Sequence, residues 1–264
     1  MLIVQISDLH LAAKGRKTLG VAPMAQNLAR CIEAINALVP KVELVMITGD
    51  ITHDGTVAEA ENAAGILQAL HAPYHVMPGN HDDRDVLWSV FGGAAIPDRP
   101  DGFLNYVVKV TGLRLIAMDS VMAGGHGGHF CDVRLDWLTA RLAEEPDAPT
   151  AIFMHHPPAR MGVAESDLDG FQGAARLGDI IAAHSNIVGI FCGHIHLAAH
   201  TGWNGTTVST APSMGMQLAP DLTLEQPSQF VLEEPGFQLL LWSKDRGLVT
   251  HTLYARNPDG PFDF

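Results

Sequence analysis

The chain has 264 residues, of which 47% are hydrophobic and 17% charged, a composition typical of a globular protein and not of a disordered one. This length suits one large α/β domain or two small ones with a real core. The formal net charge of −13 disfavours duplex DNA or another nucleic acid polymer as partner, because no run of Lys or Arg offers a local cationic patch. An anionic substrate must therefore be small, or be held by something other than basic side chains, with metal ions as the obvious candidate.

The sequence gives no sign of a membrane segment or a leader. No apolar run reaches the roughly 18 residues that a spanning helix needs, and the N-terminus begins as a strand, without a basic region or a small-residue cleavage site. Cys31, Cys131 and Cys192 are odd in number and scattered, which fits a reducing compartment better than a disulfide framework. We therefore expect a cytoplasmic protein with no membrane partner.

Strand-like and helix-like segments alternate over the first 200 residues. In chain order we expect a strand at Leu2–Ser7, a helix at Pro23–Leu38, a strand at Val42–Thr48, a helix at Val57–Leu70, a strand at Tyr74–Met77, a hairpin of Asn105–Val110 and Leu113–Met118, a helix at Asp132–Leu142 with Asp132 as its N-cap, a strand at Thr150–Met154, a helix at Ala174–Ala183 and a strand at Ile187–Cys192. After Gly202 the pattern changes to strands at Thr206–Thr210, Gln238–Trp242 and Leu248–Tyr254. This order predicts a layered α/β sandwich, and the absence of a repeat or linker favours a single domain over 1–264.

Polar side chains follow five of the predicted strands, at the point where each strand ends. The five segments are Asp8-Leu9-His10, Gly49-Asp50, Gly79-Asn80-His81-Asp82, His155-His156-Pro157-Pro158 and Gly193-His194-Ile195-His196. One such segment alone is more often a turn or a cap than a ligand site. Five such segments together indicate a ligand site, because ligands of α/β sheets bind at the carboxyl ends of the strands.

These donors have the chemistry of a metal site. Imidazole and carboxylate suit Mn, Fe, Co and Zn, and no cysteine accompanies them, which disfavours a structural thiolate zinc site. The candidate ligands number seven: Asp8, His10, Asp50, Asn80, His155, His194 and His196. A single ion that must also bind water cannot accommodate seven protein ligands, whereas two ions that share one carboxylate can.

In this order, Asp-x-His, Gly-Asp, Gly-Asn-His-Asp, His and Gly-His-x-His resemble the calcineurin-like metallophosphoesterase superfamily over residues 1–200. The segments around Asn80, His155 and His194 are similar to the class III cyclic nucleotide phosphodiesterases and the bacterial glycerophosphodiesterases. Protein phosphatases of the superfamily carry Asp-Arg-Gly after Gly-Asp, which this chain lacks. The resemblance implies a four-layer α-β-β-α sandwich of two mixed sheets. It also implies that residues 201–264 complete the second sheet and form a candidate surface for a homodimer or larger assembly.

The resemblance also implies a role for each ligand. Asp8, His10 and His196 would hold the first ion, Asn80, His155 and His194 the second, and Asp50 would bridge them. His155 is preferred over His156, which would then face the opposite side in a structural role. The two ions would be Mn, Fe, Zn or Co, and a hydroxide that they hold would attack a small phosphodiester, either a 3′,5′-cyclic nucleotide or a glycerophosphodiester.

His81 is the predicted catalytic residue, and His81 and Asn80 are the predicted contacts to substrate. Asp82 would either orient the His81 ring or cap the following helix. His53 is a candidate for lining the pocket, and the loop histidines His126 and His129 either face the substrate or are solvated. Substrate choice should depend on the loops Ala123–Phe130 and Met214–Gly236, where Met214, Met216 and Gln217 stand and a further histidine does not.

Three alternatives stay open from sequence. A nuclease or a phosphomonoesterase would use the same site, although the acidic surface argues against a polymeric substrate. A catalytically silent scaffold on the same fold would have lost ligands, whereas all seven are present. A purely structural metal site fits poorly with an asparagine ligand beside a histidine that is not counted as one.

Overall fold

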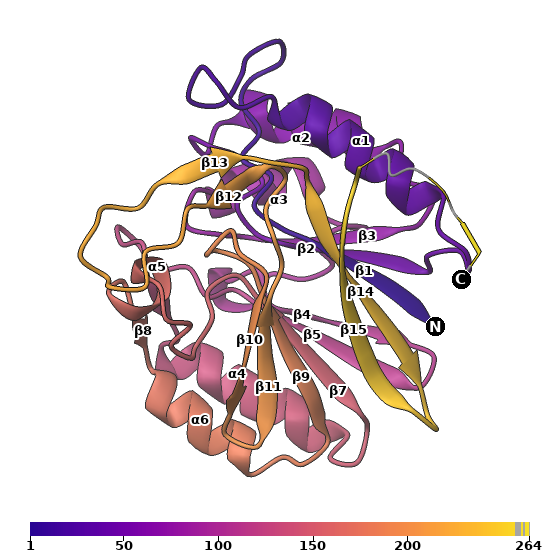
Figure 1. Cartoon of the computed structure of the whole chain (residues 1–264). Coiled ribbons are helices and arrows are strands. Elements are labelled where there is room, and N and C mark those ends of the chain that lie inside the picture. The colour runs from indigo at the N-terminus through magenta and orange to yellow at the C-terminus, as the bar shows by residue number, and fades with distance from the viewer. Residues whose placement is uncertain (257–259, 261, 264) are drawn as a thin grey trace.

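Two β-sheets face each other, and helices cover their outer faces, in the computed structural model, which describes residues 1–256, 260 and 262–263 (Figure 1). The first sheet has the order β15-β14-β1-β2-β3 and the second the order β10-β11-β9-β7-β5-β4. Parallel and antiparallel pairs occur in both. The expected α-β-β-α arrangement of two mixed sheets is therefore confirmed.

The bounds of the elements follow. The first sheet consists of β1 (Leu2–Ile6), β2 (Leu44–Thr48), β3 (Tyr74–Met77), β14 (Gly236–Ser243) and β15 (Gly247–Tyr254), and the second of β4 (Tyr106–Val110), β5 (Leu113–Met118), β7 (Thr150–Met154), β9 (Ile187–Cys192), β10 (Ala199–Trp203) and β11 (Thr206–Thr210). The helices are α1 (Met24–Asn36), α2 (Val57–Leu67), α3 (Arg84–Phe91), α4 (Asp132–Glu144), α5 (Ala164–Asp167), α6 (Ala174–Ala182) and the 3-10 turn η1 (Pro100–Gly102). Two small ribbons pair β6 (Gly128–His129) with β8 (Phe171–Gln172) and β12 (Met216–Leu218) with β13 (Phe230–Leu232).

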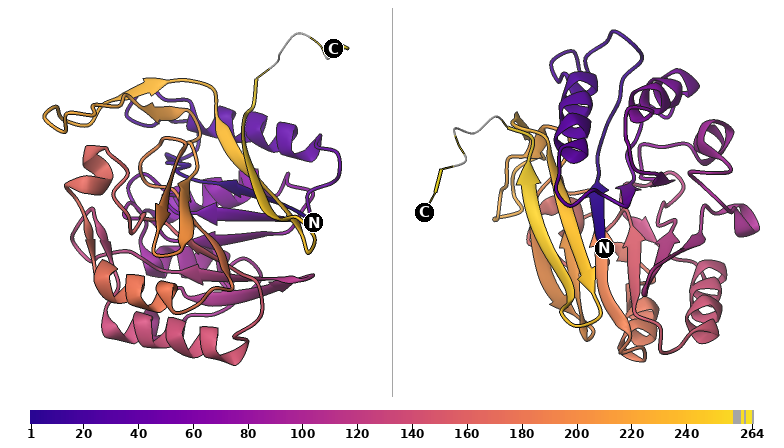
Figure 2. Two further views of the ribbon diagram at one scale, coloured as in Figure 1. Left: turned by 60° about the horizontal axis from the view of Figure 1, so that its bottom comes forward. Right: turned by 90° about the vertical axis from the view of Figure 1, so that its right-hand side faces the viewer.

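Apolar periodicity explains the layers. In α1 the side chains of Leu28, Cys31, Ile32 and Ile35 recur on one face and are buried, which seats this helix on the first sheet. Figure 2 shows α1 and α2 outside the first sheet and α4 and α6 outside the second. One apolar cluster includes residues of both sheets, and a second fills the space between the second sheet and its helices.

The carboxyl ends of β1, β2, β3, β7 and β9 lie at one edge of the sandwich, and hydrogen bonds between the sheets fix this alignment. The side chain of Gln5 donates to the main-chain oxygen of Cys192 at 2.8 Å. The ring Nδ1 of His155 lies 2.7 Å from the main-chain oxygen of Thr48. The turns that follow these five strands are therefore neighbours, although they come from opposite sheets.

The C-terminal part differs from the expectation. Residues 201–264 were predicted to complete the second sheet, but only β11 and the end of β10 do so, whereas β14 and β15 extend the first sheet beside β1. The physical reason is that β14 is an apolar strand whose residues pair with those of β1 from Leu2 to Gln5. The single-domain division and the assembly surface remain predictions, and residues 257–259, 261 and 264 of that segment lie outside the described residues.

Several local expectations also need correction. The N-cap of α4 is Cys131, so Asp132 is the first helical residue and places its charge in the first turn. The sequence pattern did not reveal β6, β8, β10, β12 or β13, because strands of two or three residues carry no periodicity and β10 alternates weakly. Within the loop Ala123–Phe130, Gly128 and His129 form β6 and pair with β8.

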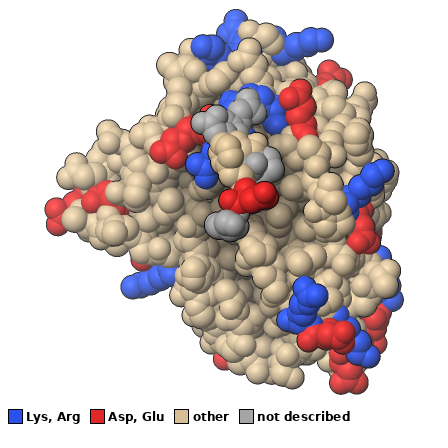
Figure 3. Space-filling view, turned by 45° about the vertical axis from the view of Figure 1, so that its right-hand side comes forward, with Lys and Arg blue, Asp and Glu red and all other residues tan. Residues whose placement is uncertain are grey.

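Two surface properties bear on partners. Among the described residues, no helix combines the length and the apolar character that crossing a bilayer requires. On the face shown in Figure 3, Lys and Arg side chains are dispersed and alternate with Asp and Glu instead of forming one basic patch. This face therefore offers no cationic track for a nucleic acid backbone.

Candidate metal centre

The five strand-end turns bring the seven predicted ligands to one place. Main-chain hydrogen bonds join the turns: the N–H of Asp8 donates to Gly49 at 3.1 Å, that of His10 to Asp50 at 2.8 Å, and that of Gly193 to His155 at 2.9 Å. The carboxylate of Asp8 accepts the main-chain N–H of His194 at 3.1 Å. The strand-end turns that carry the predicted ligands are thus joined to one another by hydrogen bonds.

Most of the predicted ligands have an unusual backbone conformation. Five of the seven adopt a left-handed conformation with positive φ: Asp8 (54°), His10 (40°), Asp50 (49°), His194 (73°) and His196 (52°). For a residue with a side chain this costs roughly 1–2 kcal/mol. Such strain clusters at functional sites, where the surrounding structure holds it. The turns therefore orient these side chains into the site at the expense of local backbone energy.

The first group of donors comes from β1, β2 and β9. Ligand atoms of Asp8, His10, Asp50 and His196 all lie within 4.8 Å of one another. The Nε2 atoms of His10 and His196 are 2.9 Å apart, and Nε2 of His196 is 3.4 Å from Oδ1 of Asp8. These four residues are those predicted for the first ion and for the bridge, and their ligand roles stay a prediction.

The second group comes from β3, β7 and β9. The side-chain oxygen of Asn80 lies 3.1 Å from Nε2 of His155 and 3.1 Å from Nδ1 of His194. Oδ2 of Asp50 lies 3.3 Å from the same Nε2 of His155 and 3.4 Å from Nε2 of His10. One carboxylate oxygen of Asp50 therefore lies beside both groups of donors.

In three of the predicted ligand histidines, one ring N–H donates to a main-chain oxygen. Nδ1 of His155 bonds to Thr48 at 2.7 Å, Nε2 of His194 to Glu165 at 2.9 Å, and Nδ1 of His196 to Met216 at 2.6 Å. In the neutral form of each ring this nitrogen carries the proton, so the other nitrogen presents a lone pair to the site. Lone pairs that converge with carboxylate and amide oxygens fit divalent metal ions.

The electrostatics of the site agree with this chemistry. Burial lowers the pKa of His194 to about 3 and holds the pKa of His10 well below its usual value, so both are neutral near pH 7. Burial raises the pKa of Asp8. Burial would also raise the pKa of Asp50, but the neighbouring charge of His155 and their hydrogen bond hold it well below its usual value. Burial would lower the pKa of His155, but the charge of Asp50 raises it to about 9, so in the absence of ions the two form an ion pair.

His81 and Asp82 have separate roles, which corrects the prediction for Asp82. Nδ1 of His81 lies 2.8 Å from the main-chain oxygen of His53. The Asp82 carboxylate instead accepts the main-chain N–H groups of Ile51, Thr52 and Gly79 at 2.8–3.0 Å, and the N-cap of α3 is Asp83. Asp82 neither orients the His81 ring nor caps the helix. It fastens the Asp50 turn to the Asn80 turn, and burial raises its pKa to about 6.

The structure also revises the position expected of His156. Its ring lies 4.7 Å from that of His155 and 4.5 Å from that of His194, between centroids, so it does not face the opposite side. The strand ends at Met154, so the two histidines lie in a turn and the alternation of a strand no longer applies. Its Nδ1 pairs with the Ser120 hydroxyl at 2.9 Å, which supports the predicted structural role.

A cavity of about 400 Å³ opens over both groups of donors. Of the predicted ligands, His10, Asp50, Asn80, His194 and His196 line it, together with His53, His81, His126 and the apolar side chains Leu19, Ile195, Met216, Leu218 and Phe230. Both loops expected to govern substrate choice therefore contribute to the wall. His129 is held elsewhere, with Nδ1 3.2 Å from the Arg134 guanidinium. Glu165, Asp169, Ser228 and Gln229 also line the cavity and carried no motif that could have revealed them.

Comparison with known proteins agrees with this geometry. The family model for calcineurin-like phosphoesterases matches residues 1–198. A probable glycerophosphodiester phosphodiesterase, GpdQ, from Arcobacter nitrofigilis is 36% identical over 100% of this chain and 97% of its own length. The 3′,5′-cyclic adenosine monophosphate phosphodiesterase CpdA of Escherichia coli is 28% identical over 94% of this chain and 87% of its own. The crystal structure of a dimetal phosphatase from Danio rerio shares the fold, with a TM-score of 0.71, 16% identity and coverage of 97% and 99% of the two chains.

Proposed function

Because the chain belongs to the calcineurin-like phosphoesterase family, we propose that it is a dinuclear metal-dependent phosphodiesterase that hydrolyses a small phosphodiester. The observation that carries this proposal is the position of Asp50. Its Oδ2 atom lies 3.4 Å from Nε2 of His10 and 3.3 Å from Nε2 of His155, so one carboxylate oxygen serves both groups of donors. Two divalent ions held by these residues would supply Lewis acidity and would lower the pKa of bound water from about 15.7 towards 7.

The protein's own residues would divide the remaining work. Asp8, His10 and His196 would hold one ion, Asn80, His155 and His194 the other, and Asp50 would border both. His81 lines the cavity beside Asn80 and would donate a hydrogen bond or a proton to the phosphoryl or leaving-group oxygen. The apolar wall formed by Met216, Leu218 and Phe230 would contact the alcohol part of the substrate.

Two substrate classes fit, a glycerophosphodiester and a 3′,5′-cyclic nucleotide. The full-length match at 36% identity favours a glycerophosphodiester, and the cyclic nucleotide phosphodiesterases among the relatives support a 3′,5′-cyclic nucleotide as the alternative. A polymeric nucleic acid is disfavoured by the net charge of −13. We also propose Mn, Fe, Zn or Co as the ions and a cytoplasmic location, which is supported by the free thiols of Cys31, Cys131 and Cys192.

The test is a substrate panel on protein stripped of metal and reloaded with Mn²⁺. We would compare kcat/KM for bis(p-nitrophenyl) phosphate, p-nitrophenyl phosphate, 3′,5′-cAMP, 2′,3′-cAMP and glycerophosphoethanolamine. We expect the diesters to be turned over well above the monoester, and the best natural diester identifies the substrate class. A monoester preference would assign a phosphomonoesterase, and no turnover with any metal would favour a non-catalytic scaffold.

A further inference from the structure

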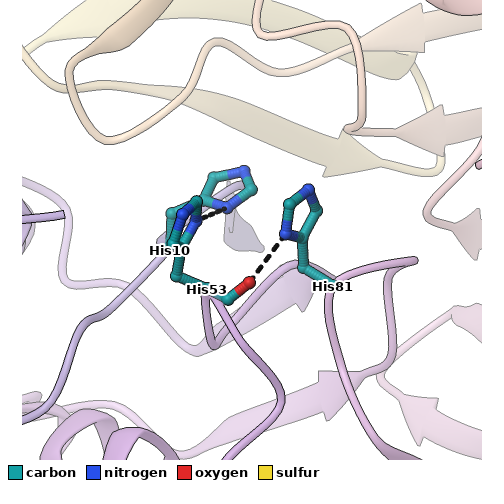
Figure 4. A group of neighbouring side chains, drawn as sticks. All are labelled: His10, His53 and His81. Carbon is teal, nitrogen blue, oxygen red and sulfur yellow. Dashed lines mark hydrogen bonds between the residues drawn. The ribbon is translucent and has the colours of Figure 1, made fainter. Parts of the chain in front are cut away.

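The four ligand histidines do not share one way of fixing the ring. In His155, His194 and His196 the nitrogen that faces away from the site lies 2.6–2.9 Å from a main-chain oxygen. In His10 the corresponding atom, Nδ1, faces another imidazole, with Nδ1 of His53 at 3.5 Å (Figure 4). The ring of His53 thus takes the place at His10 that a carbonyl group takes at the other three ligands.

The direction of this contact follows from the position of His10. Its Nε2 atom lies 2.9 Å from Nε2 of His196 and 3.4 Å from Oδ2 of Asp50, inside the first group of donors. A ring nitrogen that binds a metal must offer a lone pair, so the proton of the neutral His10 ring belongs on Nδ1. Nδ1 of His53 must then accept that proton, and Nε2 of His53 carries its own.

The main chain sets the two rings against each other. The N–H of Leu11 donates to Ile51 at 3.0 Å, and the N–H of His53 donates back to Leu11 at 3.2 Å, so the turns after β1 and β2 run side by side. Thr52, between Ile51 and His53, is fastened by its N–H to Asp82 at 2.8 Å. The approach of the His53 ring to His10 is therefore fixed by backbone pairing on both sides.

The main-chain oxygen of His53 serves a second group. It lies 2.8 Å from Nδ1 of His81, and the two rings are nearly parallel, with centroids 5.3 Å apart and an interplanar angle of 16°. His53 thus contacts a predicted metal ligand through its side chain and the predicted catalytic histidine through its backbone. Its half-buried ring also lines the cavity.

We propose that His53 is a positioning residue of the metal centre: its ring accepts the Nδ1 proton of His10 and holds His10 in the tautomer that binds the first ion. This inference rests on the proposed dinuclear function. It makes the side chain at position 53 a determinant of metal affinity. The backbone contact to His81 does not depend on the side chain, so a substitution at position 53 should act first on the metal.

The test uses two substitutions that differ in one property. His53→Leu has no acceptor, whereas His53→Asn places a carboxamide oxygen where Nδ1 now lies. In the metal-free protein, ¹⁵N chemical shifts of His10 should report a proton on Nδ1 in the wild type and in His53→Asn, and a mixture of tautomers in His53→Leu. Substituting a residue that hydrogen-bonds to a metal ligand typically lowers the metal affinity about 10–100-fold. Zn²⁺ competition against a chromophoric chelator should therefore show such a loss at one of the two sites in His53→Leu, and in neither site of His53→Asn.

His200→Leu, which removes an exposed histidine of β10, is the matched control and should leave both Zn²⁺ affinities unchanged. Where His53→Leu fails to fold, His53→Ala repeats the measurement with less added apolar surface. An unchanged His10 tautomer and Zn²⁺ affinity in His53→Leu, or an equal loss in His53→Asn, would overturn the proposal. Neither readout uses a substrate, so failure here is distinct from failure of the phosphodiesterase assignment, in which the ions bind normally and no diester is turned over.

Discussion

The ring Nδ1 of His81 lies 2.8 Å from the main-chain oxygen of His53. Because that nitrogen donates to the carbonyl, the other ring nitrogen, Nε2, is left on the side away from it (Figure 4). His81 also lines the cavity, beside the predicted ligand Asn80. One ring nitrogen thus holds the side chain in place, and the other can donate to a substrate oxygen when the ring is an imidazolium, which carries a proton on both nitrogens.

His81→Ala should therefore separate chemistry from metal binding. Loss of a positioned acid or hydrogen-bond donor typically lowers turnover by about 10²–10⁴-fold, and we expect kcat to fall within that range. The metal content should stay at two ions per chain, because the bond of His81 to Oδ1 of Asp50 uses the main-chain N–H, which alanine keeps. Elemental analysis beside steady-state kinetics measures both. If the metal is lost together with activity, His81 is a ligand and its assigned role is wrong.

Asp50→Asn should reduce the number of bound ions. The Asp50 carboxylate is buried and its Oδ2 borders both groups of donors, whereas a neutral amide supplies less charge to either. We expect fewer than two ions per chain after dialysis against Mn²⁺ and no measurable diester hydrolysis. Asp54→Asn removes an exposed carboxylate from the same loop and is the control. Two tightly bound ions in Asp50→Asn would contradict the bridging role.

Gly193→Ala should disturb the first group of donors through sterics alone. A Cβ atom at this position would lie 1.8 Å from Oγ of Ser7 and 2.7 Å from Oδ2 of Asp8, too close for either to stay. Overpacking of this kind costs about 1–3 kcal/mol, and the forced shift of Asp8 should also weaken metal binding. At Gly202, where an added Cβ meets nothing within 4 Å, alanine should be tolerated. Denaturant unfolding and metal titration of the two variants decide the point, and equal behaviour would refute it.

Asp82→Asn tests the link between the turns at Asp50 and Asn80. The carboxylate accepts three main-chain N–H groups and the Thr52 hydroxyl, and an amide would turn one acceptor into a donor that faces donors. An unsatisfied buried group costs about 1–3 kcal/mol, which we expect as a loss in the free energy of unfolding. Asp83→Asn should be nearly neutral, since asparagine is an equally good N-cap for α3. Urea unfolding of both metal-free variants measures the difference, and a neutral Asp82→Asn would remove Asp82 from the support of the site.

Removal of metal should lower stability without unfolding the protein. Ions that bind only the folded chain stabilise it by RT ln(1 + [L]/Kd), which is about 2.7 kcal/mol at a hundredfold excess over Kd. The two apolar clusters do not involve the ligands, so the metal-free chain should stay folded with a lower Tm. Calorimetry with increasing Mn²⁺ after chelation should show Tm rising with free metal. A Tm independent of Mn²⁺ would mean that the donors do not hold ions.

The predicted ligands could be identified from the sequence, because each follows a recognisable strand and the order of the five segments is specific. The strands from Leu113 to Met118 and from Thr150 to Met154 also match their predicted bounds. These inferences need only local periodicity and the rule that parallel strands end at one edge. The structure brings the donors together as that rule predicts, while their roles as ligands stay a prediction.

The remaining features depend on contacts that no local pattern encodes. From the sequence, Asp82 is either a helix cap or a carboxylate that orients His81. Its actual hydrogen bonds to the main-chain N–H groups of Ile51, Thr52 and Gly79 depend on the packing of two turns, which the sequence pattern does not show. The placement of β14 beside β1 is a choice between two sheets, settled by long-range pairing. The approach of His53 to His10 likewise follows from the parallel course of two turns that are 43 residues apart in the chain.

The predicted ligands come from both sheets, and His10 and His196 are separated by 186 residues. No short segment of the chain contains a complete set of donors for either ion, so a partly folded chain offers the metal little before both sheets have docked. Contacts of such high sequence separation carry a large loop-closure entropy and form slowly. Bound metal should therefore leave the refolding rate almost unchanged and slow the unfolding rate, so that the ions stabilise the folded chain kinetically.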